Sequence, residues 1–310
     1  MLTLEALQSK IKSVEDLGAV VRTMKTLAMV NIRQYEKARI TLTDYSKTIE
    51  LGLQALLRER YFSETMTLLP NSQKQNHGLV GVILFGSDHG LCGQFNEQIV
   101  AYALEQLNQQ QIPCDRRQIA TVGTRLLPHL ETAKQPIHNQ FSLPSSIAGT
   151  TQLVQEILLT IEQWRFRQIT EPGEEIYNLE QLLLFYNHSL SSTSYQPFTV
   201  QLLPLDINWL HQLEQRPWNS AALPTQTMSW ERLFPVFIRQ YLFVSLYQAI
   251  VESMASENGS RLTSMQAAEK NIEERLIDLN ADYRSSRQNS ITAELLDIIA
   301  GFEALKQPRT

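Results

Sequence analysis

The fold is decided by a long stretch near the C-terminus, residues 244–283, which reads VSLYQAIVESMASENGSRLTSMQAAEKNIEERLIDLNADY. Apolar side chains return every three or four residues through this stretch and on its N-terminal side. A seven-residue apolar repeat is typical of a long helix that buries one seam against a second helix. The predicted seam positions are Phe234, Phe237, Tyr241, Val244, Val251, Ala255, Leu262, Met265, Ile272, Leu276, Leu279 and Tyr283.

The predicted helix extends from about Trp230 to Lys306, with no proline after Pro235 until Pro308. At about 1.5 Å per residue, roughly 70 helical residues span about 100 Å, which exceeds the width of a compact domain of this size. Near its end the register slips by one residue, and Phe302 and Leu305 would be unfavourably exposed without a partner. The apolar positions after the slip are Ile291, Leu295, Ile298, Phe302 and Leu305.

A second long helix is predicted at the other end of the chain, from Thr3 to about Leu57, where no proline occurs. The same repeat runs through it, with Gly18 and Lys25 as exceptions. We therefore expect the terminal helices to pair as an antiparallel coiled coil, with the longer helix projecting past the shorter. The seam positions of the N-terminal helix are Leu4, Leu7, Ile11, Val14, Val21, Ala28, Ile32 and Tyr35.

The middle of the chain alternates short apolar runs with helical patterns, which predicts an open, mostly parallel sheet. The fold class is thus α/β: a coiled-coil shaft from residues 1–60 and 228–310, with an inserted Rossmann-like domain at 78–210. The stretches 70–78 and 171–176 are expected to be surface loops, and 215–227 a linker. Strands are expected at 79–85, 119–122, 181–186 and 198–202. Helices are expected at 96–109, from just after Gly123 to Leu130, and at 151–165.

The bulk composition excludes some classes of protein. The net charge of −5 argues against nucleic-acid binding, which usually needs a basic excess. Only Cys92 and Cys114 are present, so neither a disulfide framework nor a cysteine metal motif is expected. No apolar run reaches the roughly 18 residues needed to cross a bilayer, and the N-terminus lacks a signal pattern. We expect a soluble intracellular protein whose membrane link passes through a partner.

The glycine-rich segment 86–93 follows a predicted strand and precedes a predicted helix, which is the position of phosphate-binding loops. It matches neither the P-loop nor the dinucleotide fingerprint, so a structural turn is the favoured interpretation. The alternative is a docking surface that presents Asp88 and His89 at the edge of the sheet. The six histidines show no metal spacing, and His188 is expected to be hydrogen-bonded structure. No catalytic residue, cofactor or metal is predicted.

Several segments together resemble the gamma (central shaft) subunit family of rotary F-type ATP synthases, with this chain as a divergent member. The resemblance covers essentially the whole chain, and it rests on the order and spacing of motifs that are each weak alone. The matching segments are residues 11–14, 24–28, 86–96, 122–128, 186–188, 202–205, 252–265 and 283–295.

The resemblance implies a function without an active site. It implies a shaft that couples rotation of a membrane ion ring to the catalytic hexamer, with a proton or sodium ion as the driving ion. The implied partners are the alpha and beta subunits of the hexamer, the epsilon subunit and the membrane c-ring. The implied location is the cytoplasmic face of a bacterial inner membrane or a thylakoid membrane, reached through partner subunits.

The resemblance also implies contact residues. Arg284, Arg287, Gln288 and Thr292 match the part of the shaft that meets the ring, where arginine can pair bidentately with carboxylates. Met24 and Lys25 match a pair that lies beside this Arg-Gln stretch in the family, and for Met24 packing between the helices is an equal alternative.

The chain departs from the family pattern at three places. Residues 15–21 read EDLGAVV where the family usually has a polar pair and more basic residues. In the glycine-rich segment, His89 occupies the position of an Arg in the family, and Gln94 occupies the position of a second Gly. The region before Trp230 lacks the usual aromatic-and-proline pattern. Two alternatives stay open: a sheet-domain enzyme or binder with a pocket near Asp88 and Gly123, and a coiled-coil scaffold that associates with itself.

Overall fold

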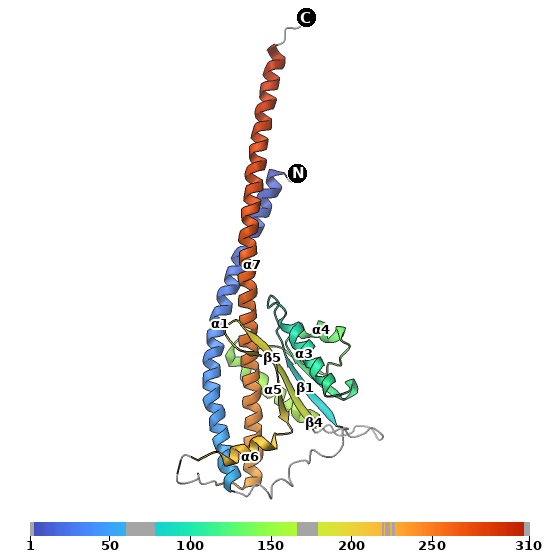
Figure 1. Cartoon of the computed structure of the whole chain (residues 1–310), viewed down its shortest axis with the longest axis vertical. Coiled ribbons are helices and arrows are strands. Elements are labelled where there is room, and N and C mark those ends of the chain that lie inside the picture. Colours follow the sequence, from blue (N-terminus) through green and yellow to red (C-terminus); the bar gives the residue numbers. More distant parts are fainter. Residues whose placement is uncertain are drawn as a thin grey trace. The chain divides into compact units, whose positions relative to one another are not determined.

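The computed structural model describes residues 3–59, 78–165, 179–218, 220, 224 and 227–306, with the backbone alone at 59 and 302–306. The chain divides into two compact units, residues 1–28 with 262–310 and residues 29–261. We call the first the coil unit and the second the sheet unit. Two helices, α1 (Leu4–Glu59) and α7 (Trp230–Lys306), contribute to both (Figure 1). The units are described in turn.

The sheet unit contains a five-stranded sheet in the order β3-β2-β1-β4-β5. The first four strands in this order are parallel, and β5 forms an antiparallel hairpin with β4. In the register, Ile83 of β1 lies between Ala120 and Leu184. The prediction of an open, mostly parallel sheet is confirmed. The strands are β1 (Leu79–Phe85), β2 (Arg117–Val122), β3 (Asn139–Phe141), β4 (Leu179–Ser189) and β5 (Tyr195–Leu203).

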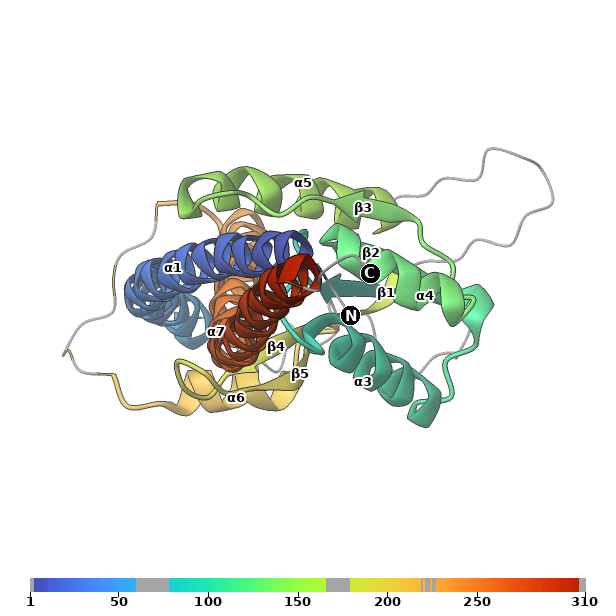
Figure 2. The same ribbon diagram turned by 90° about the horizontal axis from the view of Figure 1, so that it is seen from above.

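Helices cover both faces of this sheet, with α3 and α5 on opposite sides of β1 (Figure 2). Side chains alternate along β4: Leu182 and Leu184 join the core on the α5 and α7 side, whereas Leu183 and Phe185 join the core on the α3 side. Because both faces are buried at the centre of the sheet, β1 and the middle of β4 are almost continuously apolar instead of alternating with polar residues. The helices are α3 (Phe95–Gln109), α4 (Leu127–Thr132), α5 (Ile147–Arg165) and α6 (Ile207–Gln215).

A third apolar cluster joins the end of α1 to α6 and to the first turns of α7. Leu53 of α1, Leu210 of α6 and Val244 of α7 are buried in it. Gly52 permits the close approach of α1 and α7, because a Cβ at this position would lie 2.3 Å from Cε1 of Phe237. The glycine in an otherwise helical pattern is therefore explained by packing.

In the coil unit, the predicted seam of α1 is buried against α7. Val21 packs with Met265 and Ile272. The two exceptions to the repeat have specific partners: a Cβ at Gly18 would lie 3.3 Å from Cγ2 of Ile272, and Lys25 forms an ion pair with Glu269. The antiparallel pairing predicted for the terminal helices is confirmed.

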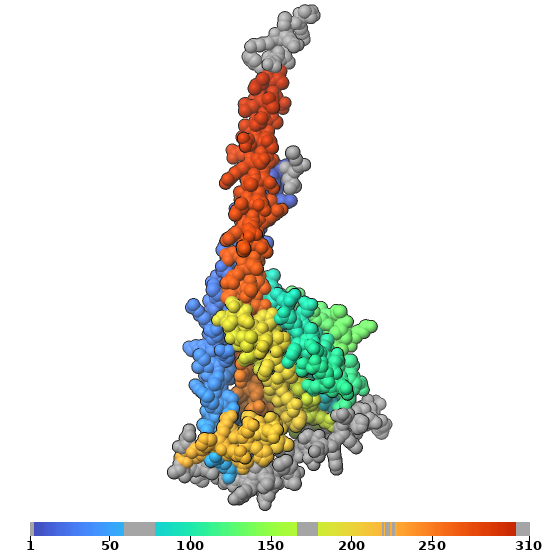
Figure 3. Space-filling model, viewed as in Figure 1, coloured from blue at the N-terminus to red at the C-terminus, as the bar shows by residue number. Residues whose placement is uncertain are grey.

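Within the coil unit, α7 continues beyond the N-terminus of α1 with no other described element beside it (Figures 1 and 3). Ile291, Leu295 and Ile298, which follow the predicted slip in register, are all exposed. Phe302 and Leu305 lie outside the residues whose side chains are described.

One expectation about hydropathy needs correction. Helix α7 contains an 18-residue window with a mean hydropathy of 1.3, which by length and composition is apolar enough to cross a membrane. Of this window 39 % is buried inside the protein. A buried core helix passes the same test as a membrane span, and α7 contributes Leu246, Ile250 and Val251 to the core beneath the sheet.

Two elements were not predicted. Strand β3 has only three residues, too few for a periodicity to show. Helix α6 begins after Asp206, whose side chain accepts a hydrogen bond from the backbone N–H of Asn208, an N-cap contact that was overlooked in the sequence. Of the expected loops, 70–77 and 171–176 lie outside the described residues, as does part of the expected linker 215–227.

Candidate functional site

The candidate site is the joint between α7 and the carboxyl edge of the sheet, entirely within the sheet unit. Every residue of α7 from 251 to 260 is buried, so that no face of the helix is left to solvent there. Two serines attach this segment to the sheet. Ser256 donates a hydrogen bond to the carbonyl of Asn187 at the end of β4, and Ser260 donates one to the carbonyl of Cys92 in the glycine-rich turn, at 2.8 and 2.5 Å.

Arg261 of α7 connects the helix to the glycine-rich turn. Its Nη2 lies 2.5 Å from Oε1 of Glu257 and 3.4 Å from the carbonyl oxygen of His89. Burial raises the pKa of Glu257, and the neighbouring guanidinium of Arg261 opposes this rise. Tyr35 of α1 borders the same charges, and burial together with the carboxylate of Glu257 raises its pKa to about 12. This end of the joint therefore places a charged pair in a largely dry environment.

A second buried carboxylate lies one turn earlier on α7. Glu252 is 3 % exposed and forms an ion pair with Nδ1 of His188 at the end of β4. The other oxygen of Glu252 accepts a hydrogen bond of 3.1 Å from Gln248. The expectation that His188 is hydrogen-bonded structure is confirmed.

The tip of the β4–β5 hairpin lies against the same helix. A Cβ at Gly259 would lie 2.7 Å from the carbonyl oxygen of Ser192, so only glycine lets the hairpin approach this closely. The hydroxyl of Ser192 donates to Glu36 of α1 at 3.3 Å. The hairpin tip thus contacts both α1 and α7 at the carboxyl edge.

The glycine-rich turn is held rigidly by its own hydrogen bonds. The side-chain amide of Asn96 accepts from the N–H of Ser87 at 2.9 Å and donates to its hydroxyl at 2.8 Å. Gly123, with a φ of 106°, brings the next strand end against this turn, and a Cβ there would lie 2.7 Å from Ser87 N. The favoured interpretation of 86–93 as a structural turn is consistent with this geometry.

The two predicted docking residues of this turn differ in their surroundings. The carboxylate of Asp88 accepts backbone N–H bonds from Thr124 and Leu143, at 2.8 and 2.7 Å, so it holds three loops together. The side chain of His89 is exposed. A docking role for either residue stays a prediction.

The predicted ring-contact residues lie in the coil unit. Arg284, Arg287, Gln288 and Thr292 are all exposed, and the hydroxyl of Thr292 donates to the carbonyl of Gln288 at 2.8 Å. Their contact with a partner stays a prediction.

Met24 and Lys25 do not lie beside that stretch. Met24 packs at the cluster of Val21, Met265 and Ile272, and Lys25 pairs with Glu269. Glu269 precedes Arg287 by 18 residues, or about 27 Å along a helix. The expected neighbour relation is wrong for this chain because the antiparallel register pairs residue 25 with the region of 269. The packing alternative for Met24 agrees with the structure.

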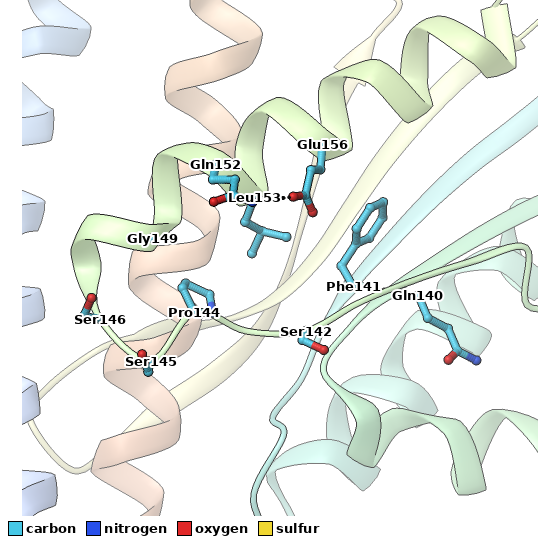
Figure 4. A pocket seen from close by; sticks show the side chains of 10 residues that line it. All are labelled: Gln140, Phe141, Ser142, Pro144, Ser145, Ser146, Gly149, Gln152, Leu153 and Glu156. Atoms are coloured by element: carbon cyan, nitrogen blue, oxygen red, sulfur yellow. Dashed lines mark hydrogen bonds between the residues drawn. The ribbon is translucent and has the colours of Figure 1, made fainter.

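The alternative of a small-molecule site gains little from the structure. An open hollow of about 430 Å³ lies where β3 ends and α5 begins, and neither Asp88 nor Gly123 lines it (Figure 4). Serines and glutamines make up half of its lining, and its one carboxylate, Glu156, accepts a hydrogen bond from Gln152 at 3.0 Å. Within the described ranges, no three His, Cys, Asp or Glu side chains are grouped to hold a metal.

The sequence marks Glu252, Glu257 and Arg261 only as part of the segment 252–265 that carries the family resemblance, and their role in the joint was not predicted. A signal was present: apart from Met254, residues 252–261, ESMASENGSR, carry small or polar side chains on every face of a helix whose flanking segments follow an apolar repeat. This composition is typical of a helix segment that is enclosed by other parts of the backbone and whose polar groups are hydrogen-bonded to them.

Comparisons with known proteins agree with this architecture. A family model described as ATP synthase matches residues 3–305. The chain is 23 % identical to the ATP synthase gamma chain of Sulfurovum sp. (strain NBC37-1), over 99 % of this chain and 100 % of that one. It is 27 % identical to the ATP synthase gamma chain of Geotalea uraniireducens (strain Rf4), again over 99 % and 100 %.

Solved structures show the same fold. A chain in the cryo-EM structure of the Euglena gracilis mitochondrial ATP synthase, OSCP/F1/c-ring, is similar with a TM-score of 0.64 and 17 % identity, covering 99 % of this chain and 97 % of that one. A chain in the central stalk/c-ring structure of the Tetrahymena thermophila mitochondrial ATP synthase has a TM-score of 0.52 and 19 % identity, covering 80 % and 99 %. Because the family model spans nearly all of the sequence, the chain belongs to the gamma family of ATP synthase subunits.

Proposed function

We propose that this chain is the central rotor shaft of an ion-translocating rotary ATP synthase. Its partners are the alpha and beta subunits of the catalytic hexamer, the epsilon subunit and the membrane c-ring. The shaft converts rotation of the ring into conformational cycling of the catalytic subunits and performs no chemistry itself. It works at the cytoplasmic face of a bacterial inner membrane or a thylakoid membrane, and partner subunits hold it there.

The observation that carries the proposal is the joint of the sheet unit, taken with family membership. A shaft must turn together with the domain that receives the torque. In the joint, Ser256 bonds α7 to the end of β4, and Ser260 and Arg261 bond it to the glycine-rich turn. Because hydrogen bonds are directional, they resist rotation of the helix about its own axis relative to the sheet.

The exposed residues of the coil unit support contact with a surrounding ring. Arg284 and Arg287 present guanidinium groups to solvent, and these groups pair well with carboxylates or backbone carbonyls of a partner. The apolar side chains of Ile291, Leu295 and Ile298 are also exposed, which favours an apolar sleeve around this part of α7. If one conformation of a partner subunit binds a face of the coil more tightly than its other conformation, contact with that face shifts the partner toward the tighter-binding conformation.

The proposal is tested by co-expressing the chain with the alpha and beta subunits of the catalytic hexamer from the same source. The number of copies of the chain per hexamer and the rate of ATP hydrolysis are then measured. We expect one copy per hexamer, multi-turnover hydrolysis, and arrest when a cysteine at Arg287 is cross-linked to the ring. The matched control is a cysteine at Ser142 in the sheet unit, left without a cross-link. A chain that purifies alone and does not alter hydrolysis by the ring would refute the proposal.

A further inference from the structure

Gly259 lies within α7, although the helix itself does not need a glycine there. Its φ is outside the left-handed region, so the backbone would accept any residue with a Cβ. Space is what selects glycine: a Cβ would lie 2.7 Å from the carbonyl oxygen of Ser192, 3.4 Å from its carbonyl carbon and 3.6 Å from Cα of Thr193. All three atoms are backbone of residues 191–193, which we call the hairpin tip. No change of a side-chain rotamer can therefore relieve the contact.

The hairpin tip is itself fixed by hydrogen bonds. The N–H groups of Leu190 and Ser191 both donate to the carbonyl of Ser194, at 2.9 and 3.1 Å. The hydroxyl of Ser191 accepts from the N–H of Ser194 at 3.1 Å, and the hydroxyl of Ser192 donates to Glu36 of α1 at 3.3 Å. The tip is thus a braced turn whose backbone lies against α7 and whose side chain is attached to α1.

The contact with the hairpin tip is possible at one position of α7 only. The one other glycine of this helix is Gly301, where a Cβ would meet nothing within 4 Å. Turning α7 by one residue, about 100°, would bring Asn258 or Ser260 against the tip. Moving α7 along its axis by about one turn would bring Ala255 there. Each of these residues has a Cβ that would collide with the backbone of the tip.

We propose that Gly259 is a positioning residue: with the hairpin tip seated against it, it sets the angular and axial register of α7 in the sheet unit. This inference rests on the proposed function, in which torque passes between the sheet unit and α7. Close-packed atoms have low compressibility and transmit strain, so a backbone contact resists a small rotation that the hydrogen bonds of the joint would tolerate. The contact stiffens the joint against twist.

The first test is a double-mutant cycle in the full chain alone, followed by urea unfolding. In the second background, Asn-Gly replaces residues 191–193, which shortens the hairpin to a two-residue turn. With the wild-type tip, we expect Gly259→Ala to lower the folding equilibrium constant about fivefold. With the short hairpin, the same change should raise this constant, because only helix propensity remains. Gly90→Ala is the control and should have the same effect in both backgrounds. A loss of equal size in both would overturn the inference.

The second test measures twist in the assembled complex and needs no change to the hairpin. The hexamer is fixed to a surface and cross-linked to the chain through Arg287→Cys. A bead is then attached through Ser142→Cys, with the exposed Cys114→Ser preventing a second attachment. The remaining angular fluctuation of the bead reports elastic twist between the two attachment points. We expect its variance to be at least twofold larger in Gly259→Ala than in the wild-type chain, and unchanged in Gly90→Ala.

The two tests separate the inference from the function on which it rests. An unchanged variance in Gly259→Ala would show that the contact contributes to folding alone, and it would overturn the positioning role. A wild-type chain that does not assemble with the hexamer would instead refute the proposed function. The double-mutant cycle, which needs no partner, would still decide whether the hairpin tip and Gly259 act on each other.

Discussion

Replacing Gly259 by alanine tests the contact between the hairpin tip and α7. In an open helix position, alanine stabilises by about 1 kcal/mol relative to glycine. Here the new Cβ would lie 2.7 Å from the carbonyl oxygen of Ser192, and the atom that must move is backbone. Overpacking of this kind costs about 1–3 kcal/mol. We therefore expect Gly259→Ala to destabilise the sheet unit by about 1 kcal/mol, which is opposite in sign to the propensity effect.

The measurement is urea unfolding followed by tryptophan fluorescence, since Trp164 is buried in the sheet unit. Gly90→Ala is the control in the same joint: the nearest atom to its new Cβ is 3.9 Å away, and its φ is not in the left-handed region. That variant should be neutral or more stable by about 0.4–1 kcal/mol. Amide exchange at Leu190, whose N–H bonds to Ser194, should accelerate only in Gly259→Ala. If Gly259→Ala stabilises the protein as much as Gly90→Ala does, the proposed packing is wrong.

Three further predictions follow from the contacts of the two units. The raised pKa of Tyr35, about 12, means that the folded state keeps its proton between pH 10 and 12, so that stability falls as pH rises through this window. Tyr35→Phe should remove this dependence and gain about 1 kcal/mol on wild type between pH 9 and 11, measured by urea unfolding; equal slopes for both proteins would contradict it. A double-mutant cycle on Lys25→Met and Glu269→Gln should show coupling of about 0.5–1 kcal/mol that weakens with salt, because both side chains are partly exposed; zero coupling would show that this ion pair does not stabilise the coil unit. Ser260→Ala leaves the carbonyl of Cys92 without this donor and should cost about 1–3 kcal/mol, whereas the exposed Ser285→Ala should cost almost nothing; similar effects of the two would count against the joint.

The seams of both terminal helices could be predicted because the repeat that buries them is local. Val21, Met265 and Ile272 each follow from their spacing alone. The exceptions in the same repeat could be noticed but not explained, since Gly18 depends on Ile272, more than 250 residues away. An apolar period identifies which face is buried but not which residue lies opposite.

The joint was beyond sequence reasoning for the same reason. The alternative interpretation of the glycine-rich segment presented Asp88 at the edge of the sheet, yet its carboxylate accepts bonds from N–H groups 36 and 55 residues further along the chain. Glu257 and Arg261 have the spacing of an ordinary surface pair on a helix. The pair is buried because the turn and the hairpin pack around α7. The small and polar composition of residues 252–261 indicates that this segment is enclosed, but not which elements enclose it.

The two units hold α7 by different interactions, and the difference bears on how torque passes. In the coil unit the seam is mainly apolar, and apolar contacts are non-directional, so they oppose separation of the helices more than small rotations. In the sheet unit, Ser256 and Glu252 connect α7 to neighbouring residues at the end of β4, and Ser260 connects it to the glycine-rich turn. Three directional contacts around one helix leave it no free rotation against the sheet. A rotor built in this way would twist elastically in the coil unit while the sheet unit turns as a rigid body, so a substitution in the joint should impair coupling more than one of equal stability cost in the seam.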